Sequence, residues 1–328
     1  MKLVRLIPKE NSKYHFGEGY LEESSLIFHS HSLFSAIVNN FVKLYGEFDK
    51  RLLDLKVSSL LFKFEDIYFI PKPIVPFFNI PKSDDAKKIK KIKFISLEAF
   101  NEYLNKSLNI ENIKERIIGK EFLIGEKEVD SLKKYGSLNE INLISKEIEQ
   151  KVAIDRIKNT TLEKDGRGQL YSVEFIRLNY GAEFYFLVDY DGLDKDLIKK
   201  INASIKLIED EGLGGKRSVG AGFFDKVIIE DLDKRFIELF DREKNCYLTL
   251  STAIPKNDKV KYYNLVEIGG YIYTLKKLTY LKKRILALSE GSIVEKGFVG
   301  DYKDLKPNNS INPVYVNGKP ILMPTKVY

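Results

Sequence analysis

The chain has 328 residues, of which 44% are apolar and 31% charged, a composition typical of an ordinary soluble protein with room for two domains. Its 54 lysines and arginines exceed 47 acidic residues, and the net charge of +7 favours a polyanionic partner. The single cysteine, Cys246, excludes an intramolecular disulfide framework and a cysteine-based zinc cluster, and it fits a reducing cytoplasm. No apolar run approaches the roughly 20 residues of a membrane span, so we expect no membrane partner.

In chain order, hydrophobic periodicity predicts six elements in the first part of the chain. They are a strand at 2–8, a helix at 32–45, strands at 66–70 and 183–190, a helix at 194–210 and a strand at 221–230. Residues from about 75 to 182 interrupt this series. We interpret them as an insertion of short helical segments followed by a hairpin with arms at 151–161 and 170–178, joined through the Asp165-Gly166 turn signal.

Without the insertion, the order of elements is β-α-β-β-α-β, the ferredoxin-like (RRM-like) order. The sequence therefore predicts an α+β protein with a first ferredoxin-like domain at 1–240. Residues 241–328 begin again with strand-like runs, at 246–254, 271–275 and 313–316, with only a weak helix signal between them. We expect a second ferredoxin-like domain there, rich in β-structure.

Residues 211–222 form a glycine-rich loop between the second predicted helix and the strand that follows it. The residues expected to bind a ligand are Gly212, Gly214, Gly215, Lys216, Arg217 and Ser218. Walker and dinucleotide loops run from strand to helix, and neither motif matches this loop, so we expect no nucleotide cofactor. Bare amides beside two cations suit the phosphates of a bent nucleic-acid backbone. The alternative is a helix-capping glycine followed by a flexible turn.

The chain has three histidines, His15, His29 and His31. A metal site needs a third ligand beside the His29 and His31 pair, and the sequence supplies neither an HExxH spacing nor a carboxylate cluster, so we expect no metal. Metal-free RNA cleavage needs a group that titrates near neutrality, which keeps a histidine general acid or base open. The competing interpretation is that His29 is a capping or core residue at the start of a helix.

The hairpin arms combine cations with aromatic side chains. The cations are Lys151, Arg156, Lys158, Lys164, Arg167 and Arg177, and Tyr171 and Phe175 lie on the returning arm. Positive charge that follows a phosphate chain beside aromatic faces is typical of single-stranded RNA binding. An ordinary solvated hairpin has the same composition, so this signal alone does not decide.

Taken together, these stretches resemble the RAMP superfamily of CRISPR-associated proteins, and within it the type III-A (Csm complex) subunit that binds the 5′ handle of the guide RNA (crRNA). Residues 29–36 (His-Ser-His-Ser-Leu-Phe-Ser-Ala) are similar to that family's His-Ser-Asp-Thr-Leu-Phe-Ser-Ala, and residues 152–160 with Leu170-Tyr171 resemble its IDR-x-T hairpin. Residues 290–292 (Glu-Gly-Ser) and 313–318 (Pro-Val-Tyr-Val-Asn-Gly) resemble its C-terminal signature. The chain departs from the family at His31, where aspartate is usual, and at Lys158, where threonine is expected.

The resemblance implies a non-catalytic, cytoplasmic RNA-binding subunit that has no cofactor. It would hold the crRNA 5′ handle and bridge a large polymerase/cyclase-like subunit to the backbone RAMP subunit of the Csm complex. Arg156, Lys158 and Arg167 would hold the strand near the loop, while His29 and Ser30 would shape the cleft. Two alternatives remain open: a metal-independent crRNA-processing endoribonuclease that uses a histidine, and a structural scaffold without RNA contact.

Overall fold

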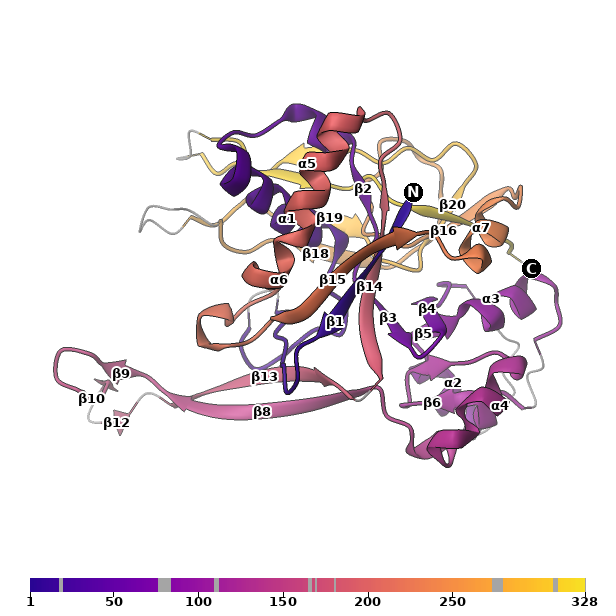
Figure 1. Ribbon diagram of the computed structural model, residues 1–328, viewed down its shortest axis with the longest axis horizontal. Helices are drawn as coiled ribbons and strands as arrows, with labels where there is room; N and C mark the ends of the chain where they lie inside the picture. Colours follow the sequence, from indigo (N-terminus) through magenta and orange to yellow (C-terminus); the bar gives the residue numbers. More distant parts are fainter. Residues whose placement is uncertain are drawn as a thin grey trace.

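The computed structural model describes residues 1–17, 20–75, 84–108, 112–164, 167–168, 170–179, 181–272, 280–308 and 312–327. A mostly antiparallel sheet in the first part of the chain carries helices on one face and the C-terminal part of the chain on the other, and a long hairpin projects from it (Figure 1). The helices of the described residues include none that is long and apolar enough to cross a membrane.

The main sheet has the order β15-β1-β14-β3-β4-β5-β7-β6. Its strands include β1 (Lys2–Pro8), β14 (Ala182–Asp189), β3 (Leu61–Phe64) and β4 (Ile67–Pro71), and β15 (Phe224–Asp231) forms one edge. The short strand β2 (Lys56–Val57) also pairs with β14. The predicted strands at 2–8, 66–70, 183–190 and 221–230 are confirmed as β1, β4, β14 and β15, within about three residues at each end. The strand next to β14 is β3, however, which the sequence did not predict.

Alternation along β1 explains why both faces of this sheet are covered. Val4 and Leu6 pack with α1 (Ser30–Tyr45) and α5 (Lys195–Lys206), whereas Leu3 belongs to a second core with residues of the C-terminal part. Both helices were predicted, although the second one ends at Lys206 and is continued by the single turn α6 (Ile208–Glu211). Asp194 caps α5 by accepting hydrogen bonds from the amides of Asp196 and Leu197.

The insertion begins by extending the sheet. It adds β5 (Phe94–Ser96), β6 (Ile117–Ile118) and β7 (Phe122–Leu123), together with α2 (Asp84–Lys91), α3 (Leu97–Leu104) and α4 (Val129–Leu132). The hairpin then follows as β8 (Ile144–Val152) and β13 (Leu170–Leu178), which pair along their whole length. At its tip lie the short ladders β9 (Ile154–Asp155) with β10 (Thr160–Thr161), and β11 (Glu163–Lys164) with β12 (Arg167–Gly168). The predicted turn at Asp165-Gly166 lies outside the described residues.

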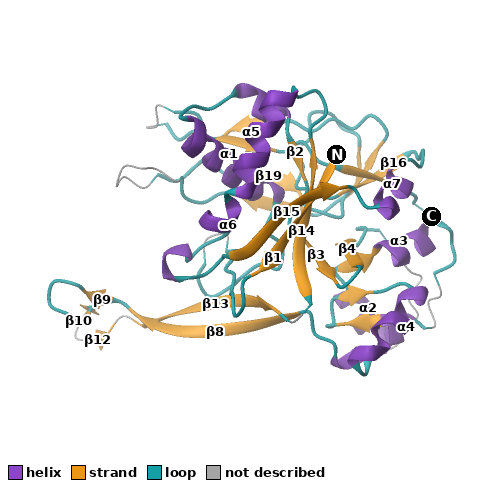
Figure 2. Cartoon of the chain, in the orientation of Figure 1, coloured by secondary structure: helices purple, strands orange, loops and turns teal. Residues whose placement is uncertain are grey.

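The C-terminal part follows α7 (Lys234–Phe240) and contains a four-stranded sheet of order β17-β20-β16-β23. Its strands are β16 (Cys246–Thr249), β17 (Val260–Tyr262), β20 (Ile293–Glu295) and β23 (Leu322–Thr325). Two further ladders pair β18 (Leu265–Ile268) with β19 (Ile285–Leu288), and β21 (Tyr302–Asp304) with β22 (Tyr315–Asn317). The helices of a second β-α-β-β-α-β unit do not occur among the described residues after Phe240, so that expectation is not confirmed (Figure 2).

Candidate nucleic-acid interface

The glycine-rich loop closes on itself before it opens toward solvent. Gly212 and Gly222 both have positive φ, 68° and 84°, and a Cβ on Gly222 would lie 2.1 Å from the carbonyl oxygen of Leu213. The amide of Leu213 donates to the carbonyl of Gly222 at 2.9 Å. Only glycine permits such a close approach of two backbone segments in the left-handed region. Gly212 and Gly222 are therefore required for the loop's shape and are buried inside it.

The loop also rests on the segment that follows β1. The amides of Gly215 and Gly222 donate to the carbonyls of His15 and Lys13, both at 2.8 Å. A Cβ on Gly214 would lie 2.6 Å from the carbonyl oxygen of His15. These amides are thus used within the protein, which corrects the expectation that the whole run of glycines presents its N–H groups to a ligand. The residues that remain exposed are Gly215, Ser218, Val219 and Gly220.

Lys216 and Arg217 have different surroundings. Lys216 adopts the left-handed conformation at φ 60°, unusual for a residue with a Cβ, and its ammonium nitrogen lies 5.2 Å from the centroid of the Tyr171 ring. Arg217 donates to the carbonyl of Glu211 at 2.9 Å and lies 3.7 Å from the Glu211 carboxylate. Part of the charge of Arg217 is therefore neutralised within the loop, whereas Lys216 extends to the hairpin.

The hairpin meets the loop on one face. Val173 and Phe175 of β13 form a small buried cluster with Ala221, and Tyr171 packs against it. Residues i and i+2 of a strand point to the same side, so Tyr171, Val173 and Phe175 all face the loop. Tyr171 is paired with Lys151 of β8, whose ammonium nitrogen lies 5.5 Å from the Phe175 ring centroid. A cation and an aromatic face thus recur along this side of the arm.

His15 and Lys13, which the sequence analysis did not assign to the loop, support it from the segment that follows β1. His15 is 5% exposed, and its Nδ1 atom lies 2.8 Å from the carbonyl oxygen of Glu174. Lys13 pairs with Glu149 and lies 4.5 Å from the Phe175 ring centroid. Hydrogen bonds from Lys13 and from Lys151 lower the pKa of Glu149. No local pattern marks Lys13 or His15, because their role depends on contacts with residues more than 100 positions away in the sequence.

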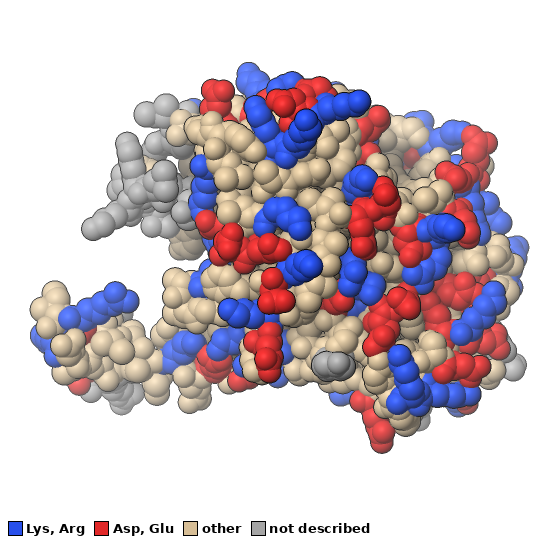
Figure 3. All heavy atoms as spheres, in the orientation of Figure 1, with Lys and Arg blue, Asp and Glu red and all other residues tan. Residues whose placement is uncertain are grey.

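Arg156 and Lys158 are exposed in the turn between β9 and β10, where the Asp155 carboxylate accepts hydrogen bonds from the amides of Ile157 and Lys158. In the space-filling view, basic side chains appear along the projecting arm (Figure 3). The side chain of Arg167 lies outside the described part of the chain. The tip cations are therefore displaced along the arm from the loop, and Tyr171 and Lys151 lie closer to it.

His29 and Ser30 lie where the start of α1 meets the C-terminal part. The Nδ1 atom of His29 lies 2.8 Å from Oε1 of Glu290, and the hydroxyl oxygens of Ser30 and Thr252 are 2.8 Å apart. Ser30 is 3% exposed. Its side chain is thus a structural contact inside the protein, and it does not line an open cleft as the sequence suggested.

His31 belongs to the same contact between the start of α1 and the C-terminal part, which we call the joint. Its ring stacks on that of His29 with 5.6 Å between centroids, and its Nδ1 atom lies 3.2 Å from the hydroxyl of Thr252. Burial lowers the pKa of His31 well below its ordinary value, and the nearby charges of His29 and Lys282 lower it further. Burial alone would raise the pKa of Glu290, but the charge of His29 and hydrogen bonds from His29 and Ser59 outweigh it, so this pKa is lowered. Among the described residues no group of three or more His, Cys, Asp or Glu side chains is placed to hold a metal.

Comparison with known proteins identifies the family to which this chain belongs. Residues 12–225, more than half of the chain, match the model of the RAMP superfamily, and residues 242–325 match that of the CRISPR Csm4 C-terminal domain. The CRISPR system Cms protein Csm4 of Methanocaldococcus jannaschii is 50% identical, over 99% of this chain and 97% of that protein. The chain therefore belongs to the RAMP superfamily and, within it, to the Csm4 family.

Solved structures agree with this assignment. A chain in the crystal structure of a Csm3–Csm4 subcomplex of the type III-A CRISPR-Cas interference complex is 44% identical, with a TM-score of 0.77 and full coverage of both chains. A chain in the crystal structure of a Csm1–Csm4 cassette with cA4 is 18% identical and has a TM-score of 0.57, over 100% of this chain and 98% of that one. The second likeness shows the fold alone.

The packing of the glycines gives a first prediction. Gly220 and Gly222 both have positive φ, but a Cβ on Gly220 would meet nothing within 4 Å. Gly220→Ala is expected to cost about 1 kcal/mol of unfolding free energy through backbone strain. Gly222→Ala adds the clash with Leu213 and is expected to cost ~3 kcal/mol or more. Urea unfolding measures both, and equal losses would show that the loop does not close as described.

The buried His31 gives a second prediction. As the pH falls below about 6.5, the unfolded chain binds a proton at this position that the folded chain does not, so stability falls with pH by about 1.4 kcal/mol per unit. The lowered pKa of Glu290 adds a loss only at more acidic pH, below the ordinary carboxyl range. His31→Gln removes the first contribution. Unfolding free energies between pH 7 and 5 should thus depend less on pH in this variant than in the native chain, and equal slopes would contradict a neutral His31.

Proposed function

We propose that this chain is a non-catalytic RNA-binding subunit of a type III-A CRISPR interference complex that holds the repeat-derived 5′ handle of the crRNA in the cytoplasm. One observation carries the proposal. The glycine-rich loop and the hairpin are far apart in sequence, yet they bring the ammonium nitrogen of Lys216 to 5.2 Å from the centroid of the Tyr171 ring. The exposed residues Gly215, Ser218 and Gly220 lie next to Lys216 in the sequence. A cation, small exposed residues and an aromatic face together are what a single-stranded RNA requires.

The proposed interactions differ in kind along this surface. Lys216 and the backbone of Arg217 and Ser218 bind a phosphate, because this is the part of the loop that the β1 segment does not cover. Tyr171 offers a face for a base. Arg156, Lys158 and Arg167 hold the strand farther along the arm. Gly212 and Gly214 act through the shape of the loop, and His29 and Ser30 act by fixing α1 against the C-terminal part.

The proposed protein partners follow from family membership. The 44% identical relative was solved in a Csm3–Csm4 subcomplex, so we infer that this chain contacts a backbone RAMP subunit of the Csm3 kind. The large polymerase/cyclase-like subunit is inferred in the same way from the Csm1–Csm4 cassettes. The arm offers a surface for such partners, because Ile148 is 64% and Leu170 74% exposed on the face that points away from the loop.

We also propose two domains, at 1–240 and 241–328. The family matches support this division, since one ends at residue 225 and the other begins at residue 242. The interpretation of the second domain as a ferredoxin-like unit is supported by its four-stranded antiparallel sheet. The two domains share an apolar core that joins Leu3 and Tyr185 to Leu248.

Removal of the loop cations tests RNA binding. Lys216→Ala alone, and with Arg217→Ala, should weaken binding of a labelled 5′-handle RNA. Each phosphate that is no longer neutralised should reduce the slope of log K against log salt by ~0.7. Fluorescence anisotropy across a salt series measures both quantities. Lys234→Ala is the matched control, because it removes the same charge from an exposed site on α7.

Unchanged affinity and slope in Lys216→Ala would contradict a phosphate-binding role for the loop. The single variant is the more decisive one, since Arg217 also binds Glu211 and its removal disturbs the loop itself. If the chain is instead a scaffold without RNA contact, we expect a different result. The pure chain would fail to bind the handle RNA at any salt concentration and would still co-purify with its protein partners.

The rival enzyme is tested separately. The stacked rings of His29 and His31 are the observation that favours a crRNA-processing endoribonuclease. The Glu290 and Thr252 contacts hold both rings in the joint between the two parts of the chain. We therefore expect no defined cleavage when the pure chain is incubated with labelled repeat RNA in EDTA and the products are separated on a gel. Cleavage at one position that disappears in His29→Ala would establish the enzyme.

A further inference from the structure

A pocket of 510 Å³ lies at one end of the C-terminal sheet, where β16 begins and β20 and β23 end. In Figure 1 the C-terminus, near which it lies, is on the opposite side of the molecule from the projecting arm. The pocket is lined by Glu243, Lys244, Asn245, Cys246, Lys261, Lys296, Thr325, Lys326 and Val327. Its volume falls within the range of small-molecule sites.

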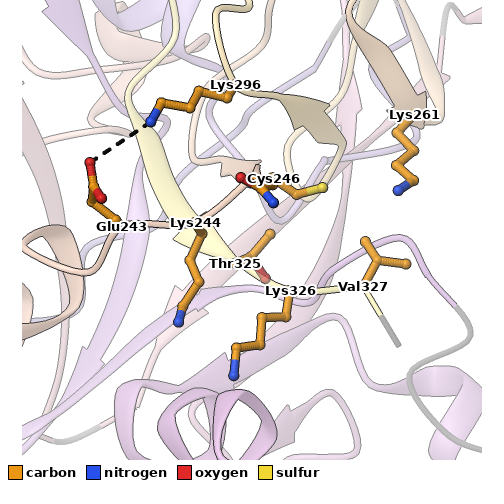
Figure 4. A pocket seen from close by; sticks show the side chains of 9 residues that line it. Glu243, Lys244, Cys246, Lys261, Lys296, Thr325, Lys326 and Val327 are labelled. Atoms are coloured by element: carbon orange, nitrogen blue, oxygen red, sulfur yellow. Dashed lines mark ion pairs between the residues drawn. The ribbon is translucent and has the colours of Figure 1, made fainter.

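Four lysines and one carboxylate line this small space, and the ammonium group of Lys326 also donates to the carbonyl of Leu104 at 3.2 Å. Figure 4 shows the side chains of Lys244 and Lys326 extending to the same side of the strand, next to Thr325. Glu243 pairs with Lys296 at 3.8 Å, but its side chain is 94% exposed, so it neutralises little of the charge inside. Burial and, after it, the charges of Lys326 and Arg242 lower the pKa of Lys244.

Thr325 provides a second and independent observation. It is 1% exposed, and its hydroxyl oxygen has no hydrogen-bond partner within the described part of the chain. A buried hydroxyl without a partner is costly, and most native structures satisfy such a group. In this pocket an anion would satisfy it, because a hydroxyl can donate to an oxygen that the lysines attract at the same time.

We propose that this pocket binds the phosphate groups of a polyphosphate-bearing nucleotide or nucleic-acid terminus. A multiply charged anion matches several like charges around one small hollow, and phosphate oxygens accept from ammonium and hydroxyl donors alike. The nine lining residues include no aromatic side chain that would stack on a base. The site therefore recognises the phosphates and not the nucleobase. This proposal does not depend on RNA binding at the glycine-rich loop.

Calorimetric titration of the full chain at physiological salt tests the proposal with three probes. Tripolyphosphate, ATP and GTP should bind with similar affinity. Lys244→Gln combined with Lys326→Gln should weaken all three by about tenfold or more, because two charged donors are removed. Lys303→Gln is the matched control, since it removes an exposed lysine of the same domain outside the pocket, and it should leave the affinity unchanged.

Thr325→Val separates binding from folding. It keeps the shape of the side chain and removes the unpartnered hydroxyl, so the melting temperature should stay the same or rise while the affinity falls about fivefold. If Thr325→Val does not fold, the variant with both Lys244→Gln and Lys326→Gln still tests whether the pocket binds phosphate. No binding of tripolyphosphate or ATP, binding weakened equally in Lys303→Gln, or binding unaffected in the double variant would each overturn the proposal.

The source of the phosphate is resolved with RNA. In a chain that already carries Lys216→Ala and Arg217→Ala, a short 5′-triphosphorylated oligonucleotide should compete with ATP if the site takes a strand terminus, and the same oligonucleotide with a 5′-hydroxyl should not. Displacement of ATP by tripolyphosphate alone, without competition by either oligonucleotide, identifies a free nucleotide as the ligand. Competition by both oligonucleotides to the same extent would contradict recognition of the terminal phosphates.

Discussion

The buried carboxylate of Glu290 is the group on which the arrangement of the two parts of the chain depends. It accepts from the hydroxyl of Ser59 and pairs with His29, and both partners come from the first part of the chain. A buried charge is stable only when its partners remain in place, because removal of one leaves the other without compensation. The joint therefore holds the start of α1 and the C-terminal part in one fixed relation, to which Ser30 and Thr252 add a second link.

The loop and this joint share a support. Phe28, directly before His29, packs against Phe16 with 4.9 Å between ring centroids, and Phe16 lies beneath Gly214. The segment from Lys13 to Phe16 thus connects the glycine-rich loop, the hairpin and the beginning of α1. In the proposed function, a rigid base of this kind positions Lys216 and Tyr171 relative to each other before RNA arrives, so that less ordering is left to binding.

Much of the central sheet and its helices follows from local patterns, because α1 and α5 have apolar residues at helical spacing, β1 alternates in part and β14 is a continuous apolar run. The short strand β3 was missed, since an apolar run of four residues does not distinguish strand from helix. The glycines of the loop were found, but their use was misjudged: a sequence shows that glycine is present and not which backbone it approaches. The interaction between Lys216 and Tyr171 joins positions 45 residues apart, so no local signal predicts it.

The pairing of β8 with β13 has a consequence for whatever molecule binds the arm. Because side chains alternate along both strands, Lys151 and Tyr171 face the loop while Val152 and Leu170 face away. A one-residue slip would exchange these two sets over the length of the ribbon. Val173 and Phe175, buried near the fixed end, oppose such a slip. These two buried side chains thus keep the face with Lys151 and Tyr171 toward the loop. The apolar face with Val152 and Leu170 stays on the other side of a hairpin that projects into solvent.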